Sequence, residues 1–144
     1  MKLYLLFIFL LISIFGFSYP IEGIWFTYSD ETGELKSKVR LYVEDGRLYG
    51  EILELYNKRE GIGDNPKCIP CPGDKKNKPV IGMEFIMGLT RNEDGEWTGE
   101  DGILEPKTGD IYDCVIWLKE DGSLAVRGYI GWFYRTQYWH RSKQ

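Results

Sequence analysis

The residues best suited to chemistry are Cys68 and Cys71, which are separated by two residues in the stretch NPKCIPCPGDKKNKPV. A pair with this spacing can form a redox centre, supply half of a metal site or close a local disulfide. A thioredoxin-type redox centre needs the motif at the beginning of a helix in a βαβ pattern, because the helix lowers the thiol pKa. Here Pro70 and Pro72 flank Cys71 in a segment without that pattern, so the sequence disfavours a redox centre.

A zinc site is the second possibility for these cysteines. A structural zinc ion needs four ligands, and Cys114 and His140 are the residues left to complete the set. Cys114 falls on the apolar face of a predicted strand and His140 lies near the end of the chain, so we predict no metal site. The favoured interpretation is a Cys68–Cys71 disulfide, with a bridge to Cys114 or no bond as alternatives. A bridge over so short a loop stiffens the loop more than it stabilises the fold.

The other titratable residues give little support for catalysis. The chain has one histidine, no Gly-x-Ser-x-Gly motif and no metal-ligand spacing. Carboxylates on strands can act as general acids, but more often they lie at strand ends or beside a basic residue. The carboxylates on predicted strands are Glu51, Glu54, Glu84 and Asp113. We therefore predict a protein that is not an enzyme and that needs no cofactor.

Residues 1–18 have the three-part pattern of a secretory signal peptide. Lys2 is followed by an almost unbroken apolar run from Leu3 to Phe17, and Gly16 and Ser18 are small at the positions that a signal peptidase reads. The alternative is a retained membrane anchor, but this run is shorter than the roughly 20 apolar residues that a span needs. We expect a periplasmic or secreted protein with no stable membrane insertion after cleavage, in a compartment where cysteines pair.

Charge and length narrow the classes of partner and the number of domains. The formal net charge is −4, and loss of Lys2 with the signal peptide makes it one unit more negative. An acidic chain is a poor candidate for binding nucleic acid or an anionic membrane surface. Residues 19–144 have the length of one domain.

Regular Gly-containing turns divide this domain into strands. Asp45-Gly46, Asp94-Gly95 and Asp121-Gly122 each lie between apolar runs that alternate with polar residues, which is the pattern of β-hairpins. The expected strands are about 21–30, 34–44, 47–56, 82–92, 96–106, 110–119, 124–132 and 134–142. Consecutive strands joined by short turns indicate an all-β, up-and-down antiparallel barrel, which closes to remove its unpaired edges. The segment from about 57 to 79 is rich in proline and lysine and is expected to be a loop.

Alternation also predicts which residues line the barrel. The walls are expected to include Val39, Leu41, Met83, Phe85, Met87, Ile116, Val126 and Ile130. The last strand places Arg135, Gln137 and Trp139 on one face. If that face looks inward, it either gives a pocket a few polar anchors or fills the barrel floor, and the sequence does not choose. The candidate ligand-binding residues are Met83, Phe85, Met87, Arg135, Gln137 and Trp139.

Three stretches of the chain stand out: GIW at residues 23–25, GMEFIMGL at residues 82–89 and VRGYIGWFYRTQYWHR at residues 126–141. Together they resemble DUF2147, a bacterial family of unknown function. The resemblance covers nearly all of the chain after the signal peptide and implies a small lipocalin-like barrel. The role of that family is not established, so the resemblance implies a fold and a compartment but little chemistry.

The Gly-x-Trp opening is also similar to that of lipocalins, in which this tryptophan lies at the closed end of the barrel beneath an arginine. The resemblance implies a barrel-closing group of Gly23, Trp25 and Arg141, although by spacing alone Arg135 would serve as well. An arginine stacked on the indole would contribute roughly 0.5–2 kcal/mol. The expected role of this group is structural.

Three functions follow from these expectations. The first is non-enzymatic binding of a small, partly apolar ligand in the barrel, and the second is a cell-envelope interaction protein with a fully packed barrel. In the second, the loop lysines Lys75, Lys76 and Lys78 or exposed aromatic residues would contact an envelope partner. The third is a redox or metal role for the CxxC loop. An interior cavity would favour the first function, and a filled interior would favour the second.

Overall fold

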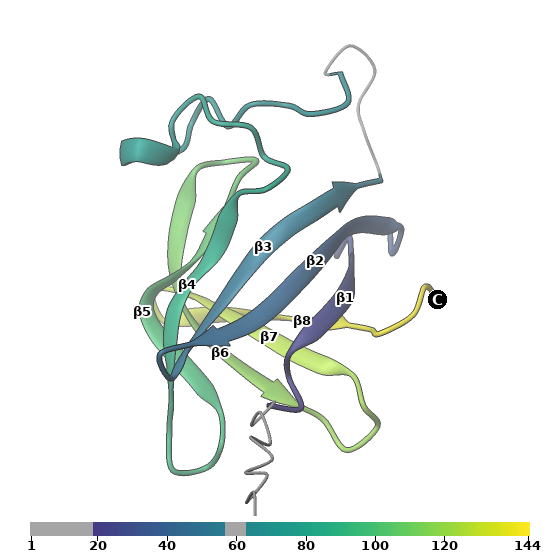
Figure 1. Cartoon of the computed structure of the whole chain (residues 1–144), viewed down its shortest axis with the longest axis vertical. Coiled ribbons are helices and arrows are strands. Elements are labelled where there is room, and N and C mark those ends of the chain that lie inside the picture. Colours follow the sequence, from purple (N-terminus) through teal and green to yellow (C-terminus); the bar gives the residue numbers. More distant parts are fainter. Residues whose placement is uncertain (1–18, 57–62) are drawn as a thin grey trace, which may run out of the picture.

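One antiparallel sheet of eight strands, taken in chain order, makes up the fold (Figure 1). The structure is a computed structural model that describes residues 19–56 and 63–144, so the expected signal peptide lies outside the described residues. The strands are β1 (Gly23–Tyr28), β2 (Leu35–Glu44), β3 (Arg47–Leu55), β4 (Glu84–Arg91), β5 (Trp97–Glu105), β6 (Asp110–Leu118), β7 (Leu124–Ile130) and β8 (Phe133–Trp139). The prediction of an all-β, up-and-down antiparallel barrel is confirmed.

The barrel closes where β1 meets β8, but it closes at one point. The N–H of Phe26 donates to the carbonyl of His140 over 2.7 Å, and the N–H of His140 donates back over 3.1 Å. Within the described ranges, no further backbone bridge joins these two strands. A seam therefore remains in the wall between the end of β1 and the beginning of β8.

The tight turns behave as their residues predict. Asp45 and Gly46 join β2 to β3 with φ values of 49° and 74°, and Glu44 pairs directly with Arg47 on the next strand. Positive φ at both central residues matches the right-handed twist of the two strands. The Asp-Gly sequence therefore fixes the register of this hairpin.

The interior is filled by side chains from all eight strands. The largest fully buried side chains include Trp25, Leu41, Leu48, Ile86, Leu89, Leu104, Ile116 and Leu124. Gly50 makes this density possible, because a Cβ at that position would lie 2.9 Å from Leu41 Cδ2 and 3.0 Å from Ile86 Cδ1. At protein packing density such a core leaves little free volume for a ligand.

Strand β4 corrects the expected alternation of Met83, Phe85, Met87 and Leu89 on one face. The register against β3 shifts twice, and Gly88 has a φ of 70°. As a result Ile86 and Leu89 are fully buried, whereas Met87 lies opposite Tyr49 and is only partly buried. The expectation for Met87 was wrong because irregularities in pairing break the two-residue period.

One further wall residue was misplaced. Ile130 is exposed at the last position of β7, where it pairs with Phe133 at the turn. The other expected wall residues, apart from Met87, are buried: Val39, Leu41, Met83, Phe85, Ile116 and Val126. These residues form the packed core instead of an open pocket.

The described part of the long loop, from residue 63 to the beginning of β4, lies at the top of Figure 1. It carries a short 3-10 turn, η1 (Gly73–Lys75), and the Cys68–Cys71 disulfide, which confirms the favoured pairing. Cys114 is a free, buried thiol, so the long-range bridge does not form. The loop packs tightly on the β5–β6 turn, because a Cβ on Gly109 would lie 2.1 Å from the carbonyl oxygen of Pro70.

Candidate functional site

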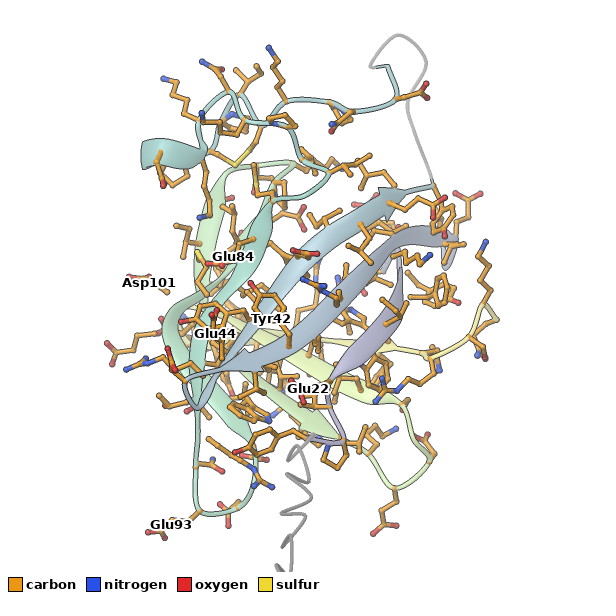
Figure 2. All side chains as sticks on the ribbon, viewed as in Figure 1. Glu22, Tyr42, Glu44, Glu84, Glu93 and Asp101 are labelled. Atoms are coloured by element: carbon orange, nitrogen blue, oxygen red, sulfur yellow. A yellow bond between two sulfur atoms is a disulfide. The ribbon has the colours of Figure 1, made fainter. Side chains whose placement is uncertain are left out.

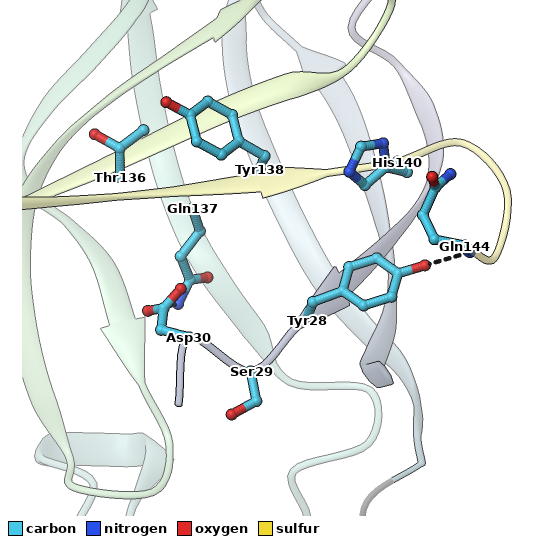
Figure 3. Close-up of a pocket in the computed structure, with 8 residues that line it drawn as sticks. All are labelled: Tyr28, Ser29, Asp30, Thr136, Gln137, Tyr138, His140 and Gln144. Carbon is cyan, nitrogen blue, oxygen red and sulfur yellow. Dashed lines mark hydrogen bonds between the residues drawn. The ribbon is translucent and has the colours of Figure 1, made fainter. Parts of the chain in front are cut away.

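A groove of about 310 Å³ lies along the seam between β1 and β8. It is lined by residues 28–30, residues 136–138, His140 and Gln144. Figure 3 shows the β1 end on one side of the groove and β8 on the other, with Asp30 facing Gln137. This volume is at the lower end of the range of small-molecule pockets, roughly 300–1,000 Å³.

The backbone of β8 contributes polar groups that point away from β7 to this groove. Because the N–H and C=O of His140 point toward β1, the same groups of Tyr138, Thr136 and Tyr134 point the same way. In the part of the chain that the structure describes, β8 pairs through its ladder with β7 alone, so these groups have no strand partner. They form a row of donors and acceptors along one wall of the groove.

A chain of side-chain hydrogen bonds supplies the polar floor. Gln137 Nε2 donates to Asp30 Oδ2 over 2.8 Å, and Trp139 Nε1 donates to Gln137 Oε1 over 3.4 Å. Arg135 Nη1 lies 3.8 Å from the same Asp30 oxygen. The amide of Gln137 is thereby oriented with a carboxylate on one side and an indole on the other.

Aromatic rings supply the apolar walls. The rings of Tyr28 and His140 meet edge to face with centroids 5.8 Å apart, and the Tyr28 hydroxyl accepts a hydrogen bond from the backbone N–H of Gln144. The ammonium nitrogen of Lys119 lies 4.6 Å from the ring centroid of Tyr138. Flat rings beside a few oriented polar groups are the usual composition of a small-molecule site.

The structure brings together four of the six candidate ligand-binding residues. Gln137 lines the groove, and Arg135 lies at its rim through Asp30. Trp139 is buried beneath the groove, with its ring centroid 5.9 Å from that of Phe85. Met83 and Met87 lie elsewhere: Met83 lines a second groove and Met87 lies opposite Tyr49.

This second groove, of about 330 Å³, lies between the disulfide loop and the beginning of β4. Its lining combines Lys75 and Lys78 with Asp74 and Glu84. Opposite charges that alternate over an open surface compete with water and with one another, so this groove is a weaker site than the seam. The electrostatic potential in this groove therefore has no single sign, because acidic residues lie beside the loop lysines.

The barrel-closing residues lie together at the opposite end from the disulfide loop. The guanidinium carbon of Arg141 is 3.9 Å from the ring centroid of Trp25, and its nitrogens donate to the carbonyls of Glu22 and Pro20. Gly23 has a φ of 117°, and a Cβ there would lie 2.6 Å from Arg141 Nη1. Arg135, the other arginine with suitable spacing, contacts Asp30 instead.

The outer face of β2 to β4 carries a second group of polar residues (Figure 2). Tyr42 stacks on Tyr49 with centroids 5.6 Å apart, under the guanidinium of Arg40, which pairs with Glu51 over 3.1 Å. Burial and the neighbouring Glu84 raise the pKa of Tyr42. These side chains pair with one another, so we interpret this surface as an ordinary solvent-exposed face of the sheet.

The cysteines offer no metal chemistry in this structure, since both sulfurs of the loop are bonded to each other. No cluster of three potential metal-ligating side chains occurs among residues 19–56 and 63–144. Burial, with a smaller contribution from Asp113, raises the pKa of the Cys114 thiol to about 12. Cys114 is therefore protonated at neutral pH and has the properties of a small apolar side chain.

Sequence reasoning missed the β1 side of the groove. Tyr28, Ser29 and Asp30 were expected to continue a strand, but β1 ends at Tyr28 and its register against β2 shifts there. A polar triplet before a Gly turn is the signal that the chain gives for this departure. Residues 28–30 face β8 only because the barrel closes. No local sequence pattern encodes that closure.

A family model matches residues 23–141, and its description reads "Uncharacterized protein conserved in bacteria (DUF2147)". The chain belongs to the DUF2147 family. The resemblance found in the sequence is confirmed, and the match covers all eight strands in full. No curated protein matches the chain.

A solved structure shows the same fold. It is described as protein HP1028 from the human pathogen Helicobacter pylori, which belongs to the lipocalin family. The TM-score is 0.67 at 20% sequence identity, and the match covers 85% of this chain and 82% of that protein. At this identity the match shows a lipocalin-like fold for this DUF2147 chain and no more. Among the residues that the structure describes, no helix has the length and apolarity to cross a membrane.

Proposed function

We propose that this DUF2147 protein is exported and that it binds a small, partly apolar molecule, without catalysis, in the groove between β1 and β8. The observation that carries the proposal is the groove itself, which joins aromatic walls, an oriented amide and an unpaired strand edge in about 310 Å³. Small-molecule sites are concave and mostly apolar with a few placed polar groups, and this groove has that composition. The proposal places the ligand outside the core, whose large apolar side chains are fully buried.

The lining defines the chemistry of the ligand. A group with adjacent donor and acceptor atoms, such as an amide, matches the free N–H and C=O groups of Thr136 and Tyr138. Gln137 adds a side-chain amide at the floor of the groove, held by its bond to Asp30. A flat apolar part of the ligand would lie against the rings of Tyr28 and Tyr138. The proposed ligand is therefore a small amphipathic molecule with a polar, hydrogen-bonding end.

Native mass spectrometry of protein purified from its own compartment tests this proposal. The expected spectrum shows an added mass that leaves on denaturation, and the Gln137→Ala variant retains much less of it. The Glu84→Ala variant, altered in the second groove, is the matched control and should retain the added mass. A bare mass for the wild type, or equal retention in both variants, would contradict binding at the seam.

A second candidate, an envelope interaction protein, is favoured by the packed interior and by a group of exposed aromatic side chains at the β7–β8 turn. A redox or metal role for the CxxC loop has less support. Cys68 and Cys71 are 1% and 2% exposed, so their disulfide is shielded from an attacking thiolate.

A further inference from the structure

The β7–β8 turn presents apolar side chains to solvent. Ile130, Trp132, Phe133 and Tyr134 are 55%, 86%, 61% and 61% exposed. The rings of Trp132 and Phe133 stack with centroids 4.1 Å apart. We call these four residues the aromatic tip. They are nearly consecutive in the chain, so together they make one protruding apolar feature.

The aromatic tip differs from the other tight turns of the same molecule. Because Ile130 pairs with Phe133, the turn consists of Gly131, with a φ of 60°, and Trp132. Three other hairpins turn at Asp45-Gly46, Asp94-Gly95 and Asp121-Gly122, so they carry an acidic residue and a glycine and no aromatic side chain at the turn. A turn needs no tryptophan, and at 86% exposure Trp132 stabilises no core. The residue type therefore indicates a contact outside the molecule.

Two arginines flank the aromatic tip. The guanidinium carbon of Arg127 lies 4.3 Å from the ring centroid of Tyr134, and Arg135 is exposed at the next position of β8. Asp30 lies 3.8 Å from Arg135 and offsets part of its charge. The net charge around the aromatic tip is thus slightly positive, although the formal net charge of the whole chain is −4.

We propose that the aromatic tip docks into the headgroup layer of a phospholipid bilayer. Tryptophan and tyrosine prefer this layer because it accepts both an apolar ring and a polar edge. A protruding tip inserts into a fluid layer without a shaped receptor, and flanking arginines face the lipid phosphates. Docking of this kind is shallow and reversible. It does not depend on a ligand in the seam groove.

Co-sedimentation with phospholipid vesicles tests the proposal on the protein without residues 1–18. The probes are vesicles of phosphatidylcholine and vesicles of phosphatidylethanolamine with phosphatidylglycerol. We expect the wild type to bind both, because the rings contribute more than the charges. The Trp132→Ser, Phe133→Ser double variant should bind at least about tenfold more weakly. The matched control is Ile69→Ser, which alters another exposed apolar residue, 62% exposed, and should bind as the wild type does.

A second measurement places the tryptophan in the lipid. Brominated lipids should quench the fluorescence of the bound wild type, and Trp132→Phe should bind but lose most of that quenching. Failure of the wild type to bind vesicles, or equal binding by the double variant, would overturn the proposal. If instead the wild type self-associates and the double variant does not, with no vesicle binding, the tip is a contact between copies and the proposal fails.

Discussion

At the scale of single residues, Arg141 connects the two ends of the described chain. Its guanidinium covers Trp25 and donates to two carbonyls of the N-terminal segment, which ties the end of the chain to its beginning. A planar fork of donors on an aromatic face is a geometry that lysine does not reproduce. This residue therefore joins β1 to the segment after β8 at the closed end of the barrel.

Replacement of Arg141 should destabilise the fold. We expect Arg141→Ala to lower the free energy of unfolding by about 1–2 kcal/mol, since it removes a cation–π contact and charge-assisted hydrogen bonds at a partly solvated site. Arg141→Lys should recover less than half of this loss. Urea denaturation provides the measurement, with Arg135→Ala as the control. A loss in Arg135→Ala as large as that in Arg141→Ala would contradict the assignment.

The thiol of Cys114 should be chemically inert while the protein is folded. Its pKa is about 12, so it stays protonated, and it is also shielded. We expect no labelling by a maleimide at about pH 8 until denaturant is added. The unfolded thiol, with a pKa of 9.0, loses its proton first, so this group lowers stability as the pH rises from 9.0 toward about 12. Rapid labelling of the native protein would show that the core around β6 is open.

At the scale of elements, two strand glycines make opposite predictions. A Cβ on Gly50 would lie 2.9 Å from Leu41 Cδ2, whereas a Cβ on Gly128 would meet only Tyr112 Cβ at 3.9 Å. Gly50→Ala should therefore cost about 1–3 kcal/mol of stability through overpacking. Gly128→Ala should be neutral or stabilising. Thermal unfolding of the two variants is the comparison, and similar melting temperatures would contradict the close packing of β2, β3 and β4.

The elements also show which features of the fold can be predicted from local sequence. Strand number, order and tight turns follow from alternation and Asp-Gly pairs, because both act between neighbours in the chain. The faces of β4 did not follow, since the shifts at Glu51 and Gly88 arise from pairing with β3. Gln137 was predicted as a ligand-binding residue from its strand face, but Asp30 was not, because it meets Gln137 only when the sheet closes.

At the scale of the whole molecule, one sheet serves several roles along its length. The closed end is held by Trp25 and Arg141, and the middle is a packed core. Among the residues that the structure describes, the seam leaves polar groups of β8 without a strand partner, and the turn before β8 carries the aromatic tip. Both proposed contacts therefore lie on β8 and the turn before it. This part of the barrel has backbone groups without a strand partner and exposed apolar side chains.

Amide hydrogen exchange, followed by NMR, tests the central claim that a ligand lies along the free edge of β8. The comparison is between protein purified natively and the same protein denatured, stripped and refolded. We predict that the amides of Tyr134, Thr136 and Tyr138 exchange rapidly in the stripped protein and become protected in the natively purified protein. Identical exchange at these three amides, or protection confined to the disulfide loop and the beginning of β4, would contradict the account.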